Sequence, residues 1–251
     1  PGNAAGRWTF QEQRGEWRSM AARMVDAQAP GLGQLLQLAL AAIERGSEGY
    51  EEAAERLGAL QLLCEGISRR HRLAAPRLAD LRAALGWPID KDEMAADTKG
   101  DIVSDHWYIL GVANHEHDER LRERRVWLRG TQSGRHALLL DFAFKGAGWE
   151  TQWIAGAAYP VTLRFHPGSV LLRATVVEQG NASAHEWPSI DADAEIDQAS
   201  QWLGDNPWLP RVPLLLDSVQ ADIDTDGWLL RSAQGRIPLL LGAATAWTLL
   251  A

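Results

Sequence analysis

The first third of the chain spaces its apolar residues at intervals of three and four, the period of a helix with one buried face. Trp17, Ala21 and Met24 form the first apolar stripe, together with Met20 and Val25. Ser47 is a suitable N-cap for a third helix, and a fourth helix begins at Pro76. The pattern predicts four helices at about residues 8–28, 32–46, 48–67 and 76–85. Because short connections make neighbouring helices antiparallel, residues 1–86 are predicted to form a helical bundle.

Beyond a polar stretch at residues 87–105, taken as a linker, the apolar period changes to two, which is typical of strands. One further helix is predicted at Asp191–Leu203, with Ile196, Ala199, Trp202 and Leu203 facing inward. The predicted strands are His106–Ala113, Arg125–Arg129, Ala137–Phe144, Ala158–Phe165, Val170–Glu178, Leu214–Ile223, Trp228–Ser232 and Ile237–Leu241. Residues 106–251 are therefore predicted to be a mostly antiparallel sheet or barrel with one inserted helix, and the whole chain is predicted to be an α+β protein.

Composition fits an ordinary globular protein, with 46% hydrophobic and 23% charged residues in a chain of 251. Cys64 is the single cysteine, which excludes an internal disulfide and a cysteine-based zinc site, and suits a reducing compartment. The first residues show no signal-peptide pattern, and no apolar run is long enough for a membrane span. A cytoplasmic location is expected. The start at Pro1 predicts a processed chain or an excised fragment.

The net charge is −8, and residues 101–251 carry 12 basic against 19 acidic side chains. Such a chain repels a phosphate backbone unless basic residues gather on one face, so broad DNA binding is disfavoured. One basic run could hold phosphates or an acidic partner surface. Alternatively, it pairs with Glu119, Glu123 and other carboxylates within the sheet. The candidate binding residues are Arg120, Arg122, Arg124, Arg125 and Arg129.

Two other clusters have the residue types of metal sites. His115 and His117 would share one side of a strand, and His106 or His136 could add a third ligand for a metal-dependent hydrolase; a solvated loop explains the same residues. The segment Asp222 to Gly227 copies the first half of a calcium loop, but Ala233 stands where the bidentate Glu is needed, and a hairpin turn at Thr225-Asp226-Gly227 is the preferred explanation.

The remaining candidate chemistry has a structural explanation. Twelve tryptophans could stack ligands, but at strand positions they more often fill a core. The basic residues 69–72 end a helix, where cations stabilise the helix dipole. Cys64 lies on an apolar helix face, and no nucleophile elbow or phosphate-binding glycine loop is present. The chain is therefore expected not to be an enzyme.

Two stretches resemble the later part of bacterial SWIM zinc-finger family proteins. The first is Ala21–Leu32, AARMVDAQAPGL; the second is Arg120–Gly130, RLRERRVWLRG, followed by Leu138–Ala143, LLLDFA. The family's finger uses C-x-C followed by C-x-H, and this chain has neither, so no zinc ligand carries over and no cofactor is expected here. The resemblance implies the region after the finger of a cytoplasmic accessory protein. It also implies protein partners such as MoxR-type AAA+ ATPases or von Willebrand-type A domain proteins.

The sequence thus predicts a noncatalytic interaction or accessory module that binds protein partners. Nucleic-acid binding through the arginine run at 120–129 is the alternative, and a metal-dependent hydrolase is a third hypothesis.

Overall fold

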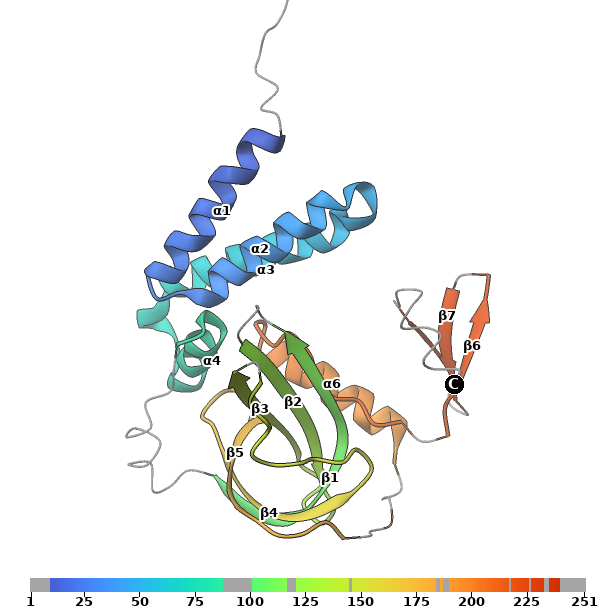
Figure 1. The fold of residues 1–251 in the computed structure, drawn as a ribbon. Helices are drawn as coiled ribbons and strands as arrows, with labels where there is room; N and C mark the ends of the chain where they lie inside the picture. The colour runs from blue at the N-terminus through green and yellow to red at the C-terminus, as the bar shows by residue number, and fades with distance from the viewer. Residues whose placement is uncertain are drawn as a thin grey trace, which may run out of the picture. The chain divides into compact units, whose positions relative to one another are not determined.

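The computed structural model describes residues 10–87, 101–116, 121–144, 146–183, 186, 190–216, 218–225, 227–232 and 235–239 (Figure 1). The chain divides into two compact units. The helical unit comprises residues 1–100 with two short later segments, 166–171 and 206–210, and the β unit comprises the remainder. Within the described ranges, no helix has both the length and the apolarity needed to cross a membrane.

The helical unit contains the four helices that the apolar period predicts: α1 (Phe10–Asp26), α2 (Pro30–Glu44), α3 (Tyr50–Ser68) and α4 (Ala75–Leu85). α2 packs against the helix before it, α1, and the helix after it, α3 (Figure 1). The prediction that Ser47 caps α3 is wrong, because Gly46–Gly49 forms a 3-10 turn that leads directly into the helix. Gly49 occupies the N-cap position, where a Cβ would lie 1.8 Å from the carbonyl oxygen of Ala42. Only glycine fits there.

The core of the helical unit is built on Leu32, Leu63, Leu81 and Leu85, and Trp208 from the segment 206–210 packs against it. A Cβ at Gly66 of α3 would lie 2.9 Å from the Trp208 ring, so the helix and the indole are in close contact. The other short segment of the helical unit, residues 166–171, is held by Asp80 of α4. The Asp80 carboxylate accepts a hydrogen bond from the Ser169 backbone N–H at 3.1 Å.

The β unit contains a closed five-stranded barrel in the order β1-β2-β3-β5-β4 (Figure 1). Its strands are β1 (Ile102–Glu116), β2 (Leu121–Gly130), β3 (His136–Phe144), β4 (Ala158–Phe165) and β5 (Arg173–Gln179). Neighbouring strands are antiparallel except β3 and β5, which run parallel and pair only at Leu138–Arg173 and Leu139–Ala174. The predicted fold, helices followed by a mostly antiparallel barrel, is confirmed.

Alternating side chains fill the barrel. Trp107, Ile109, Leu128 and Leu163 are fully buried inside it, and the Trp107 indole donates a hydrogen bond to the Val161 carbonyl at 3.0 Å. This is the core role expected for tryptophans at strand positions. β1 begins at Ile102, four residues before the predicted start at His106 and within the stretch taken as a linker. Residues 88–100 of that stretch lie outside the described residues.

The inserted helix α6 (Ala192–Asp205) is present, and Asp191 caps it by accepting hydrogen bonds from the backbone N–H groups of Asp193 and Ala194. Of the four residues predicted to face inward, Ala199 is buried and Trp202 half-buried, but Ile196 and Leu203 are exposed. The inward positions instead include Glu195, which binds partners described below. A separate antiparallel sheet consists of β6 (Gln220–Asp224), β7 (Gly227–Arg231) and β8 (Arg236–Pro238).

Candidate interaction surfaces

The arginines of the basic run point to both faces of β2. Arg124 is directly opposite Asp141 of β3, and its guanidinium binds that carboxylate at 3.1 Å through Nε and the Thr151 carbonyl at 2.6 Å through Nη1. Arg122 and Arg124 lie over the Trp149 ring, with their guanidinium carbons 5.1 and 4.5 Å from its centroid. At this end of the barrel two cations therefore stack on one aromatic ring.

Arg125 and Arg129, on the other face of β2, pair with Glu123 and Glu195. The described members of the run therefore do not form one basic face: each binds groups of this chain. Arg120 lies outside the described residues. Internal carboxylate pairing is the structural alternative that the sequence left open.

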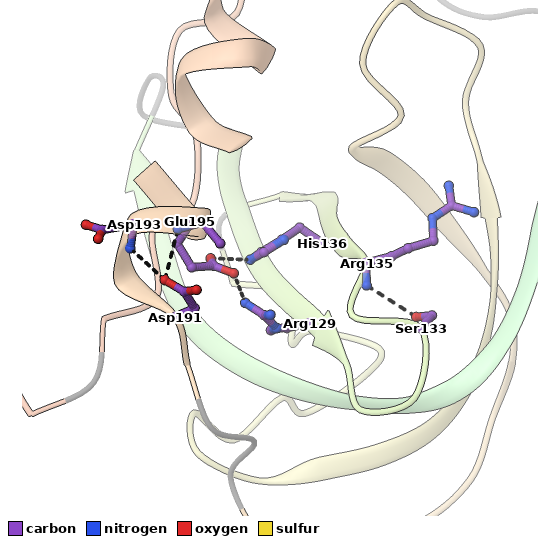
Figure 2. A network of polar contacts seen from close by, with 8 residues as sticks. Arg129, Ser133, Arg135, His136, Asp191, Asp193 and Glu195 are labelled. Carbon is purple, nitrogen blue, oxygen red and sulfur yellow. Dashed lines mark hydrogen bonds and ion pairs between the residues drawn. The ribbon is translucent and has the colours of Figure 1, made fainter. Parts of the chain in front are cut away.

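A buried polar network joins β2 and β3 to α6. Figure 2 shows the Glu195 carboxylate pointing at Arg129 and His136, with its second oxygen 3.3 Å from His136 Nε2. The imidazole also packs edge-on against Trp202 at 5.2 Å. Burial lowers the pKa of His136 below its ordinary value of 6.5, and Arg129 lowers it further, whereas Glu195 raises it. The imidazole is therefore neutral at pH 7, and the network serves to hold α6 on the barrel.

Asp105 of β1 organises the turn between β2 and β3. Its carboxylate accepts hydrogen bonds from Ser133 N (2.8 Å), Ser133 Oγ (2.7 Å), Gln132 N and His106 N. Burial would raise the pKa of Asp105, but these hydrogen bonds together lower it below its ordinary value. Sequence reasoning missed Asp105 because its partners in the turn, Gln132 and Ser133, lie 27 and 28 residues away in the chain.

Beside this turn lies an open hollow of about 470 Å³ on the barrel. It is lined by Ser104, Asp105, His106, Gln132, Pro160, Val161, Thr162, Glu178, Gln179 and Gly180. The Ser104 and Thr162 hydroxyls bond each other at 2.8 Å, and Asp105 is engaged by its turn. The side chains of Ser104, Thr162 and Asp105 in the wall are therefore committed to the fold.

The metal hypotheses gain no support from the described residues, among which no group of three or more His, Cys, Asp or Glu side chains is placed to hold a metal. His106 lines the hollow, whereas His136 belongs to the network with α6. The side chain of His115 and all of His117 lie outside the described residues.

The predicted hairpin explains the calcium-like acidic segment. β6 and β7 pair there, and Asp222 binds Arg231 at 3.0 Å; this hydrogen bond lowers the pKa of Asp222. Asp226 and Ala233 lie outside the described residues.

The edges of β3 and β5 separate after their two pairs. We call residues 140–144 and 175–179 together the β3–β5 seam. Val176 is directly opposite Leu163, which is fully buried in the barrel, so Val176 faces the same interior; yet it is 41% exposed. Val177 is 53% and Phe144 72% exposed. Apolar side chains therefore reach solvent along this line.

Comparison with known proteins assigns the helical part of the chain. Residues 4–85 match the family model described as the SWIM-associated four-helix bundle domain. The chain carries a SWIM-associated domain. The match covers α1–α4, and the resemblance seen at Ala21–Leu32 falls within it. No curated protein and no solved structure matches the chain. The SWIM-associated domain ends before β1, so the barrel and its surfaces must be interpreted from their own geometry.

Proposed function

We propose that this protein is a noncatalytic interaction module that binds an extended segment of a protein partner at the β3–β5 seam. The observation that carries the proposal is the contact between β3 and β5, which pair at only two positions although both strands continue for five more residues. Strand edges present rows of N–H and C=O groups that an added strand can bind.

The direction of the strands favours one kind of occupant. Five strands cannot alternate in direction all the way round a barrel, so one neighbouring pair must be parallel, and here it is β3 and β5. A strand entering at the seam could run antiparallel to both edges, which is the more stable pairing. Phe144, Val176 and Val177 would then cover the apolar side chains of the incoming segment.

The absence of catalysis belongs to the same proposal. His136 is buried and contacts Glu195, which also pairs with Arg129, and Asp105 serves a turn, so these two groups with a shifted pKa have structural partners. From the family resemblance we further propose a cytoplasmic protein. Its partner would be a MoxR-type AAA+ ATPase or a von Willebrand-type A domain protein.

Nucleic-acid binding, the alternative from sequence, is less well supported. Arg122, Arg124, Arg125 and Arg129 occupy opposite faces of β2 and bind groups within the chain. If nucleic acid nevertheless bound here, the affinity would fall steeply with salt and with Arg125→Ala.

Photo-crosslinking tests the proposal at the seam. A crosslinking phenylalanine analogue replaces Phe144 in the full chain, and the matched control places it at Ile154, an apolar residue that is 61% exposed. We expect position 144, and not 154, to crosslink one partner through a short extended segment. A synthetic peptide of that segment should then bind the purified protein and lose affinity with Val177→Lys. Equal crosslinking at both positions, or a peptide whose binding ignores Val177→Lys, would refute the seam.

A further inference from the structure

The outer face of α3 bears opposite charges at its two ends. Glu48 lies just before its start, Glu51 and Glu55 lie in its first two turns, and Arg69, Arg70 and Arg72 follow its end; all six are exposed. Glu65, on the same face, pairs with Arg69 at 2.8 Å. Both side chains are largely in solvent, where such an ion pair is weak. Glu52 is separate from this set because it pairs with Arg45 and Arg56.

Between the charged ends the same face carries a small residue and a large one. The positions 51, 55, 58, 62, 65 and 69 follow one another at steps of four and three, the spacing of a helix–helix seam. Gly58 is exposed, with nothing within 4 Å of a Cβ built on it, and Leu62, one turn later, is 40% exposed. Glycine in a helix interior costs about 1 kcal/mol relative to alanine, and nothing described within this chain uses the space at Gly58.

We propose that α3 pairs with α3 of a second copy of this chain, antiparallel and about a two-fold axis. In an isologous contact each residue meets its counterpart twice. When Leu62 of one copy packs over Gly58 of the other, Glu51 faces Arg69 on both sides of the axis, and Glu48 and Arg72 lie one turn beyond them. Glu55 then faces Glu65, whose charge is offset by Arg69 of its own chain at 2.8 Å. A parallel arrangement would instead place like charges together at each end. The two ends of the face are therefore complementary to each other in the antiparallel direction only.

The pairing goes beyond the proposed function, since it uses the helical unit and not the seam. The measurement is the mass of the full chain by sedimentation equilibrium across a concentration series, at low and high salt. We expect a monomer–dimer equilibrium that weakens with salt, because the charged ends are solvent-exposed. A monomer at every concentration would overturn the proposal.

Charge exchange tests the orientation. Glu51→Arg and Arg69→Glu should each weaken the dimer about tenfold or more, because each places two like-charged contacts across the axis. The double variant carries both changes and should recover the dimer, as should an equimolar mixture of the two single variants. A dimer that both single variants leave unchanged would show that copies associate through another face and would overturn the proposal.

Gly58→Ala separates pairing from folding. Alanine should raise the melting temperature of the helical unit, since it favours the helix and meets nothing in the chain, yet it should weaken the dimer by filling the place of Leu62. Gly15→Ala in α1 is the matched control, because Gly15 also has nothing within 4 Å. The control should stabilise the helix and leave association unchanged. Equal effects of the two variants on association would contradict the contact.

Discussion

Removing the Glu195 carboxylate tests the network that holds α6 on the barrel. Glu195→Ala leaves Arg129 with a side chain that is only 16% exposed, and takes away the 3.3 Å contact to His136, whose side chain is 4% exposed. The unpaired Arg129 guanidinium cannot be fully hydrated at this depth. Deleting its partner therefore costs more stability than deleting one member of a surface ion pair. Breaking a buried pair by deleting one partner costs about 3–5 kcal/mol. Because Glu195 keeps some exposure, we expect the low end, about 3 kcal/mol.

The assay is urea unfolding followed by tryptophan fluorescence, with hydrogen exchange of α6 and β2–β3 to locate the change. A loss of about 3 kcal/mol in a unit of this size corresponds to a melting temperature lower by roughly 6–12 °C. Asp101→Asn is the control, since its 2.7 Å pair with Arg135 is 30–40% exposed and should contribute less than about 1 kcal/mol.

Charge removal in pairs completes the design. Glu195→Leu combined with Arg129→Met deletes both buried charges and should restore most of the lost stability. Surface ion pairs contribute less than about 1 kcal/mol and buried ones more. If the free energy of unfolding of Glu195→Ala lies within about 1 kcal/mol of that of the natural chain, the network does not hold the helix and the reasoning fails.

Three further predictions follow from single groups. The pKa of His136 is lowered in the folded state, so the unfolded chain binds more protons below pH 6.5; stability should fall as pH drops through about 6.5, and His136→Gln should flatten that slope in melts between pH 5 and 8. Asp105→Asn should cost about 1–3 kcal/mol in urea unfolding, because it weakens the acceptor for four hydrogen bonds from Thr131, Gln132 and Ser133 of the β2–β3 turn. Gly66→Ala should destabilise the helical unit by about 1–3 kcal/mol, since its Cβ would meet Trp208 at 2.9 Å, whereas Gly58→Ala should not.

Local periodicity was sufficient to predict most elements. β4 covers the predicted residues Ala158–Phe165, because buried and half-buried positions alternate along nearly all of it. β6 starts at Gln220 and not at Leu214. The run Leu214–Leu216 is apolar, as many strands are, but it lacks the alternation of apolar and polar residues, and Leu214 is 41% exposed. β5 begins at Arg173, later than predicted, because the preceding segment 166–171 belongs to the helical unit. Period predicts type well and boundaries less well.

Partners distant in sequence were beyond such reasoning. Arg124 and Asp141 are 17 residues apart on adjacent strands, so a hairpin register suggests their contact, but Arg129 and Glu195 are 66 apart. Nothing near Glu195 marks it as buried; its place on α6 made it resemble an ordinary surface residue. The exposure of Ile196 has the same cause, because the helix is turned so that the carboxylate, and not the isoleucine, meets the barrel.

The core position of Trp208 has a consequence for synthesis on the ribosome. α1–α4 emerge first and can coil early, yet the indole that packs beside Gly66 and Leu81 is translated more than 120 residues after α4 ends. Until then Leu81 and its neighbours lack their last apolar cover. A fragment cut at the limits of the SWIM-associated domain would remain in that unfinished state, so it should bind hydrophobic dyes and resist proteases poorly compared with the intact chain.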